Sequence, residues 1–208
     1  MKTGSKDLDS IFEYKNEISM IYGPAATGKT TVAKLAAIEI ARQGKKVLFI
    51  DTENGFSTER FKQLAGKEYQ KLLDNIIFFK PSNLSEQRRT IKNIVSIVES
   101  GKIGVIIIDT IGAHYRLELK KDDKYANRTM AESIKTLKWA ADKGIPVIII
   151  NQVYSDLENN VRNVGGNMVR DACQLVIELK KDPRKLIITK PMQKEEKFEI
   201  KEDGISLL

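Results

Sequence analysis

The chain has 208 residues and a formal net charge of +7, because 35 Lys and Arg outnumber 28 Asp and Glu. A chain of this length is expected to form one α/β domain with a core of its own. No run of about 18 or more apolar residues occurs, which excludes a membrane-spanning helix. The start, Met1 to Asp7, lacks the apolar segment of a secretory signal, so we expect a cytoplasmic protein without a membrane partner. The positive charge favours a polyanionic partner, although composition bias or heat adaptation explains it equally well.

Short apolar runs alternate along the chain with stretches of helical periodicity. The apolar runs predict strands over residues 18–22, 46–50, 76–79, 105–108 and 147–150. The periodic stretches predict helices over residues 29–42, 58–64, 85–99 and 128–142. Apolar runs without polar breaks are typical of parallel strands that are buried on both faces. We therefore expect an α/β fold with a mostly parallel twisted sheet and helices on both faces.

The last third of the chain has a different pattern. Its apolar stretches, 174–179, 185–189 and 198–201, are separated by short polar breaks. Such spacing predicts hairpin-connected strands that extend the sheet in antiparallel fashion. The residues before Ile11 form a short arm, so we expect a single domain over 1–208 with residues 1–10 as that arm. The only cysteine, Cys173, lies in an apolar stretch and is expected to be a buried thiol.

A phosphate-binding motif lies between the first predicted strand and the helix that follows. The segment from Gly23 to Thr30 fits G-x-x-x-x-G-K-[ST]. Backbone N–H groups of such a loop, together with the helix dipole, form a site for a polyphosphate. The nucleotide-binding residues predicted here are Gly23, Pro24, Ala25, Ala26, Thr27, Gly28, Lys29, Thr30 and Thr31. Lys29 is expected to reach the β- and γ-phosphates and the Thr30 hydroxyl to ligate Mg²⁺.

Polar residues follow three further predicted strands, at the sheet edge where such proteins bind ligands. Asp109 ends one strand and is expected to hold Mg²⁺ through its water shell. Glu53 follows another and is the candidate base for an attacking water, with Asp51 as the competing acid. Gln152 follows a third, and its amide can both donate and accept, as a sensor of the γ-phosphate requires.

These residues resemble the ATPase core of the RecA/RadA recombinase family over nearly the whole chain. The segment 49–61, FIDTENGFSTERF, is similar to the family's DTEG-F-x-P-E-R block. Residues 149–153, IINQV, resemble its T-N-Q-V strand, and residues 165–167, GGN, its G-G-N element. The chain begins directly at this core, and within the family it most resembles the short archaeal RadB branch. The resemblance implies a RecA-like P-loop NTPase fold that binds ATP and Mg²⁺.

The resemblance also implies roles for individual residues. Glu53 matches the family's catalytic glutamate, Gln152 its γ-phosphate-sensing glutamine, and Lys29 completes the catalytic set. Arg60 matches the arginine that stacks on adenine, and Gln63 the residue that reads the adenine edge.

Two loops that bind DNA in the family correspond to residues 116–128 and 154–170 here. The DNA-binding candidates are Arg116, Arg128, Arg162 and Arg170 in these loops, with Lys180, Lys181 and Lys185 in a basic hairpin. A solvated surface explains the hairpin equally well. The first loop also lacks the aromatic and arginine richness of a strand-exchange enzyme. The only histidine, His114, is expected to contact DNA or packed neighbours rather than to act as a base.

The sequence thus predicts an ATP- and DNA-binding accessory of homologous recombination and repair, with weak Mg²⁺-dependent ATP hydrolysis and little strand exchange. The expected partners are single- or double-stranded DNA, the full-length archaeal recombinase RadA or other repair proteins, and further copies of this chain. The alternative is a RecA-like signalling ATPase that acts on protein partners instead of DNA.

Overall fold

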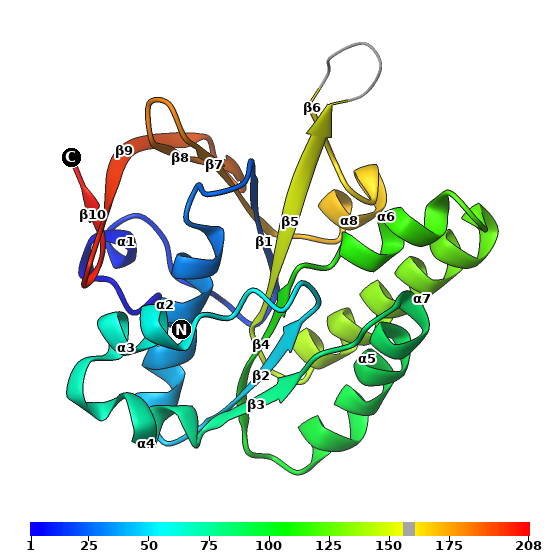
Figure 1. Ribbon diagram of the computed structural model, residues 1–208, viewed down its shortest axis with the longest axis horizontal. Helices are drawn as coiled ribbons and strands as arrows, with labels where there is room; N and C mark the ends of the chain where they lie inside the picture. Colours follow the sequence, from blue (N-terminus) through cyan, green and yellow to red (C-terminus); the bar gives the residue numbers. More distant parts are fainter. Residues whose placement is uncertain (156–160) are drawn as a thin grey trace.

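The computed structural model describes the backbone of residues 1–155 and 161–208. It describes the side chains of residues 1–153 and 164–208. Within this part, the strands form a ten-stranded sheet in the order β10-β9-β8-β7-β1-β5-β4-β2-β3, with β6 paired to β5 (Figure 1). The strands are β1 (Ile18–Gly23), β2 (Lys46–Asp51), β3 (Ile76–Phe79), β4 (Ile103–Asp109), β5 (Val147–Ser155), β6 (Val161–Asn163), β7 (Leu175–Lys180), β8 (Lys185–Lys190), β9 (Lys194–Lys201) and β10 (Gly204–Leu207). The strands β7, β1, β5, β4, β2 and β3 run parallel, whereas β8, β9 and β10 add to the β7 edge as antiparallel neighbours. The predicted α/β class and its antiparallel extension are confirmed.

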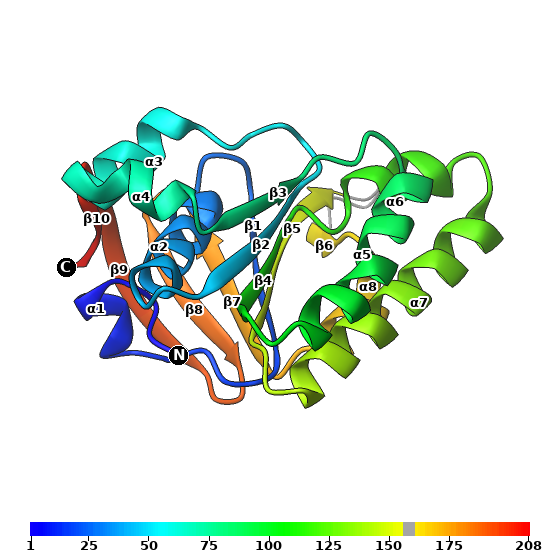
Figure 2. The ribbon, with the colours of Figure 1, turned by 90° about the horizontal axis from the view of Figure 1, so that it is seen from below.

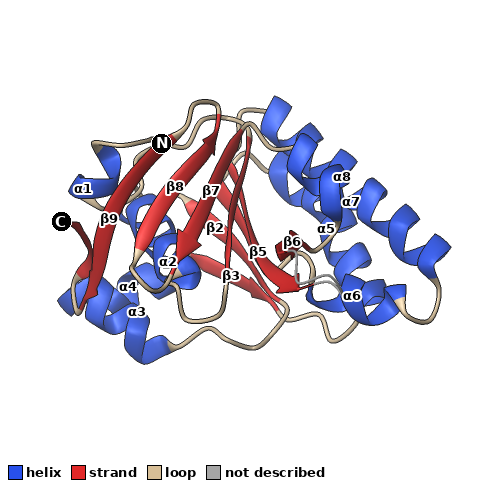
Figure 3. Cartoon of the chain, turned by 90° about the horizontal axis from the view of Figure 1, so that it is seen from above, coloured by secondary structure: helices blue, strands red, loops and turns tan. Residues whose placement is uncertain are grey.

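Helices cover both faces of the sheet, as Figures 2 and 3 show. They are α1 (Lys6–Asp9), α2 (Lys29–Arg42), α3 (Thr58–Ala65), α4 (Tyr69–Leu73), α5 (Leu84–Glu99), α6 (Ala113–Leu119), α7 (Asp123–Asp142) and α8 (Gly166–Asp171), with a 3₁₀ turn over Gly66–Glu68. One face carries α1 to α4 and the other carries α5 to α8. Among the described residues, no helix combines the length and apolar character needed to cross a bilayer.

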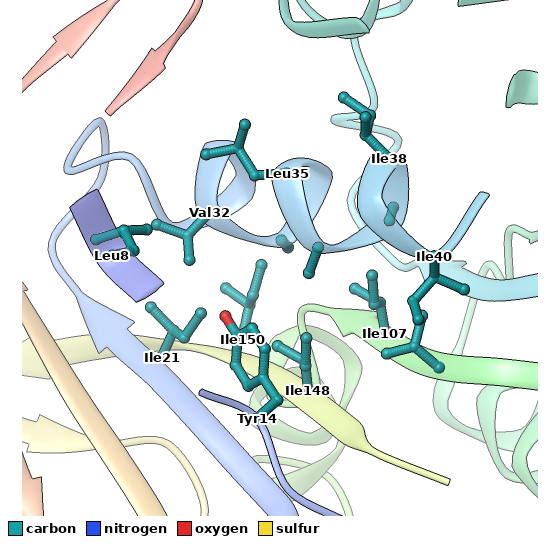
Figure 4. Close-up of a cluster of buried hydrophobic side chains, with 14 of the residues drawn as sticks. Leu8, Tyr14, Ile21, Val32, Leu35, Ile38, Ile40, Ile107, Ile148 and Ile150 are labelled. Atoms are coloured by element: carbon teal, nitrogen blue, oxygen red, sulfur yellow. The ribbon is translucent and has the colours of Figure 1, made fainter. Parts of the chain in front are cut away.

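Two apolar cores explain why the central strands have no polar breaks. Side chains alternate along each strand, so Ile107 and Ile148 contact the core beneath α2, while Ile106 and Ile149 contact the core beneath α5 and α7. Figure 4 shows the α2 side of this arrangement, in which α2 lies directly over the strands. Every residue of β4 is buried. The helix α2 and the strands beside it therefore form a rigid support for the loops at the strand ends.

The structure differs from the sequence prediction in three segments. The N-terminal arm contains α1, because Ser5 caps the helix and Leu8 is fully buried. The helix α5 begins at Leu84, one residue before the predicted start, because the Asn83 side chain caps it by accepting from the Glu86 N–H at 2.9 Å. Residues 116–128, which the resemblance predicts to be a loop, are mostly helical, because α6 extends to Leu119 and α7 begins at Asp123.

The register of the parallel strands brings the predicted site residues to one edge. Gly23 at the end of β1 pairs with Gln152 of β5, and Asp51 at the end of β2 pairs with Asp109 of β4. Because neighbouring parallel strands end at the same edge, segments far apart in sequence meet there.

Candidate nucleotide site

The phosphate loop connects β1 to α2 and closes around the Lys29 side chain. The Lys29 ammonium donates to the carbonyls of Gly23 and Pro24 at 2.9 and 2.6 Å, and the residue is 8% exposed. Burial lowers the pKa of Lys29, while the charges of Asp109 and Glu53 oppose that shift. A Cβ atom on Gly23 would lie 2.2 Å from the Leu179 carbonyl oxygen of β7, so this position accepts only glycine. The loop therefore lies tightly against the sheet with its lysine directed inward.

Thr30 and Asp109 meet beside this loop. The Thr30 hydroxyl donates to Asp109 Oδ2 at 2.7 Å, although the two residues come from α2 and β4. The pKa of Asp109 is raised to about 6, mainly by burial and also by the charges of Asp51 and Glu53, while the Thr30 hydrogen bond and the Lys29 charge oppose the shift. Bringing a cation to this carboxylate would relieve the unfavourable burial of its charge.

The competing acids Asp51 and Glu53 have different surroundings. The buried Asp51 carboxylate accepts from the backbone N–H groups of Glu53, Gly55 and Phe56 at 3.3, 3.0 and 3.0 Å. These bonds fix the turn after β2 and occupy the acceptor sites of Asp51. Glu53 is exposed, and both of its carboxylate oxygens accept from Gln152 Nε2 at 2.9 Å. Glu53 is thus the acid that faces the space in front of the phosphate loop.

The strand ends that carry Glu53 and Asp109 are joined directly. The Thr52 hydroxyl donates to the Thr110 carbonyl at 2.8 Å and accepts from the Thr110 N–H at 2.9 Å. The Thr52 N–H donates to the Asp109 carbonyl at 2.9 Å. The positions of the two acids are therefore coupled through the backbone.

Arg60 and Gln63 lie at the other end of the candidate site. The Arg60 guanidinium donates to the Lys201 and Glu202 carbonyls at 2.7 and 2.9 Å and to Gln63 Oε1 at 2.9 Å. Arg60 therefore attaches α3 to the turn between β9 and β10. Between this turn and the phosphate loop is a cavity of about 250 Å³, lined by Ala26, Gly28, Lys29, Thr30, Thr31 and Ile200.

These residues fit a magnesium nucleotide. The cavity is bordered by a lysine and a helix N-terminus, which suit phosphate, and Thr30 with Asp109 supplies the oxygen donors that Mg²⁺ prefers. Across the described part of the chain, no cluster of three or more His, Cys, Asp or Glu side chains could hold a metal. Mg²⁺ is commonly held by one or two protein ligands together with substrate phosphates.

The DNA-binding candidates are scattered over two surfaces. Arg116 is exposed and lines a cavity of about 590 Å³ between α6 and the start of α8, together with Tyr115, Leu117, Leu119, Lys120, Val164, Gly165 and Gly166. Arg170 lies on α8, where its carbonyl accepts from Lys190 at 3.0 Å. The side chain of Arg162 and residues 156–160 of the second loop lie outside the described part.

Two of the basic candidates already have acidic partners. Arg128 pairs with Glu132 at 3.2 Å within α7, and Lys185 pairs with Glu195 at 2.6 Å across β8 and β9. Lys180 and Lys181 are exposed at the end of the same hairpin. The charge of the basic hairpin is therefore partly neutralised by a glutamate of the neighbouring strand β9.

Sequence reasoning missed several residues around the site. Ile200 and Arg184 come from the C-terminal hairpins: Ile200 lines the cavity, and Arg184 donates to the Ala26 carbonyl at 3.2 Å. Only the pairing of β7, β8 and β9 brings them there. Lys34 is also missed, although a lysine within the apolar face of α2 is a visible signal.

The single histidine and the single cysteine occupy packed positions. His114 is buried and its Nε2 lies 2.9 Å from the Pro81 carbonyl, which matches the packed-neighbour alternative. Cys173 is 2% exposed, as expected.

Comparison with known proteins identifies the family of the chain. A family model described as Rad51 matches residues 1–207. The DNA repair and recombination protein RadB of Methanococcus maripaludis strain C7 is 36% identical over 204 residues, which cover 93% of each chain. The protein of the same name from Methanoculleus marisnigri is 33% identical over 217 residues, 99% of this chain and 96% of the relative. A crystal structure of the RadB recombinase matches with a TM-score of 0.82 and 33% identity, covering 100% of this chain and 99% of that one. The chain therefore belongs to the Rad51 family and is RadB-like within it.

Proposed function

We propose that this chain binds ATP with Mg²⁺, hydrolyses it slowly, and acts on DNA as an accessory of homologous recombination and repair. The observation that carries the proposal is the meeting of Lys29, the Thr30–Asp109 pair and the Glu53–Gln152 pair at one sheet edge. The relatives named as DNA repair and recombination proteins support the choice of process.

Each group has a distinct part in the proposed reaction. Lys29 binds the β- and γ-phosphates, and Thr30 with Asp109 would hold Mg²⁺. The ion, when bound, neutralises charge that develops on the phosphates. Glu53 orients the attacking water and accepts its proton. Arg60 offers its guanidinium plane to the adenine while two carbonyls hold the side chain in place.

The Glu53–Gln152 contact supports slow hydrolysis. The amide donates to both carboxylate oxygens and so occupies the acceptor atoms that an attacking water would need. Glu53 must therefore exchange this donor for the water before it can act as a base. Engagement of Gln152 by a γ-phosphate would release Glu53, which makes hydrolysis depend on the loaded state.

The same glutamine connects the nucleotide site to the proposed DNA surface. The Gln152 carbonyl accepts from the Val164 N–H at 3.3 Å, and the neighbouring Asn151 amide donates to the Val164 carbonyl at 2.8 Å. Val164 and Gly165 line the cavity that Arg116 also borders. This path supports DNA binding that depends on the nucleotide. As protein partners we propose the full-length archaeal recombinase RadA or other repair proteins, together with further copies of this chain.

The test is a titration of fluorescently labelled single- and double-stranded DNA at several salt concentrations. It is run without nucleotide, with ADP, and with a non-hydrolysable ATP analogue, each with Mg²⁺. We expect the DNA affinity to fall steeply with salt, because phosphate contacts release counterions, and to be highest with the ATP analogue. Tight ATP binding without DNA binding at about 50 mM salt would instead favour the signalling ATPase that acts on proteins.

A further inference from the structure

Lys34 is a buried cation that the proposed reaction does not use. It lies on α2, is 2% exposed, and ranks among the largest fully buried side chains of the described part. Its ammonium donates to the Ser57 carbonyl at 3.1 Å and lies 4.6 Å from the centre of the Phe56 ring. Burying an ammonium group costs several kcal/mol unless its surroundings compensate. Packing alone therefore does not explain a lysine at this position.

Both contacts of Lys34 are to the loop that carries Glu53. This loop, residues 52–57, connects β2 to α3, and Ser57 is the N-cap of α3. Asp51 accepts from the backbone N–H groups of Glu53, Gly55 and Phe56 in this loop. Lys34 holds its last part, and the Phe56 ring packs edge-on against Phe49 and Phe78 at 5.2 and 4.6 Å. Glu53 is therefore held directly by Asp51, and the far end of the same loop is held by Lys34.

The charges around Lys34 belong to the same site. The pKa of Lys34 is lowered to about 8, mainly by burial. The carboxylates of Asp109 and Asp51 oppose this shift, whereas the positive charge of Arg60 lowers the pKa further. Lys29 and Lys34 are thus two buried cations beside the carboxylates Asp51, Glu53 and Asp109. Lys34 follows Thr30 by four residues, so both lie on one face of α2.

We propose that Lys34 is a positioning residue, which holds the loop 52–57 from α2 and thereby places the Glu53 carboxylate for hydrolysis. The inference rests on the proposed function in that the positioned group is the base for ATP hydrolysis. Because Lys29, Thr30 and Lys34 share one helix, the phosphate contacts and the loop that carries the base are set by the same rigid element.

The test compares Lys34→Met, which keeps the aliphatic stem but loses the charge and the donor, with Lys34→Arg, which keeps both. Arg42→Met is the matched control, because it removes a cation from an exposed position on the same helix. Three quantities are measured: amide hydrogen exchange without nucleotide, affinity for a fluorescent ATP analogue with Mg²⁺, and steady-state ATP hydrolysis.

For Lys34→Met we expect amide exchange over residues 53–57 to accelerate about tenfold or more, while the strands β1, β4 and β5 keep their protection. We expect kcat to fall roughly ten- to a hundred-fold, because misplacing a catalytic group by about 1 Å has that effect. ATP affinity should stay within about twofold, since the groups that bind the phosphates are unchanged. Lys34→Arg should restore most of both losses, and Arg42→Met should change neither.

The outcomes that would contradict the role of Lys34 differ from the one that would contradict the proposed function. Unchanged exchange over residues 53–57 in Lys34→Met would overturn the inference, as would a loss of kcat matched by an equal loss of ATP affinity. Exchange that accelerates throughout the sheet would also overturn it, because Lys34 would then support the whole fold. Wild-type protein that binds no ATP would overturn the proposed function, whereas the exchange measurement would still decide whether Lys34 holds the loop.

Discussion

The Gln152 side chain donates to both carboxylate oxygens of Glu53 at 2.9 Å, across a separation of 99 positions in the sequence. Gln152 extends from β5, where it is paired with Gly23 of the phosphate loop, and Glu53 lies in the turn fixed by Asp51. The side chain of Gln152 thus contacts the candidate base, while its backbone pairs with the phosphate loop and accepts from the Val164 N–H. We therefore expect a conformational change in one of these elements to alter the positions of the others.

Gln152→Ala tests this link. We expect ATP affinity within about twofold of wild type, because Lys29 and Thr30 are untouched, and a kcat roughly ten- to a hundred-fold lower, because the γ-phosphate loses the amide that we propose contacts it. The difference in DNA affinity between ATP-analogue and ADP states should vanish. Steady-state kinetics and the DNA titration measure these effects, with the exposed Gln70→Ala on α4 as control. A retained nucleotide effect on DNA would contradict the role of Gln152 as sensor.

Lys29→Ala tests the phosphate site. Its ammonium is the side-chain cation that the phosphate loop itself supplies to the cavity. Removing one charge-assisted interaction of about 1.5–3 kcal/mol should weaken ATP binding roughly ten- to a hundred-fold. Titration with a fluorescent ATP analogue checks the result. Equal affinity of variant and wild type would show that ATP binds elsewhere.

Glu53→Gln and Asp109→Asn separate chemistry from metal binding. Glu53→Gln should retain ATP·Mg²⁺ affinity and lose turnover, because an amide cannot accept the proton of water. Asp109→Asn should instead raise the Mg²⁺ concentration needed for ATP binding, since the Thr30–Asp109 pair loses its charge. Mg²⁺ titrations at fixed ATP distinguish the two. If Glu53→Gln hydrolysed ATP at the wild-type rate, Glu53 would not be the base and another group would have to accept the proton.

The two basic surfaces should differ in nucleotide dependence. Arg116→Ala combined with Arg170→Ala should lower DNA affinity more in the ATP-analogue state than in the ADP state, because both residues lie near the Val164–Gly165 segment. Replacing Lys180 and Lys181 with Glu should weaken both states equally and reduce the salt slope by about one unit for each DNA phosphate that is no longer neutralised. Arg128→Ala should lower DNA affinity less than these changes do, because Arg128 is already paired with Glu132.

Cys173 gives a prediction that depends on pH. Burial raises the pKa of its thiol from 9.0 to about 12, with the charge of Lys190 opposing. Because the folded-state pKa lies above the unfolded value, the buried neutral thiol contributes its full stability below pH 9. This contribution is lost as the pH rises towards 12, because the unfolded chain then releases the thiol proton more readily than the folded one. At about pH 8 the thiol should react with a disulfide reagent only after unfolding. Rapid labelling of the native protein would show that the pocket around Cys173 opens locally.

Several parts of the fold and site follow from the sequence because they depend on neighbouring residues. The apolar run of β4 and the loop from Gly23 to Thr30 each form from a continuous segment, so their patterns predict them well. The identity of Glu53, Asp109 and Gln152 as candidates also follows, because residues directly after parallel strands share one edge. The helical structure of residues 116–128 could not be predicted in this way. It depends on the Asp122 cap and on the packing of α6 against α7, which the pattern of charged residues does not indicate.

Only the tertiary structure decides which acid faces the site. Asp51 and Glu53 are two positions apart and chemically alike, but backbone N–H groups occupy Asp51 while Gln152 faces Glu53. The contribution of Ile200 to the cavity and the burial of Lys34 likewise depend on contacts between distant segments. Sequence periodicity reports the faces of single helices and strands, whereas these contacts depend on the order and register in which the strands pair.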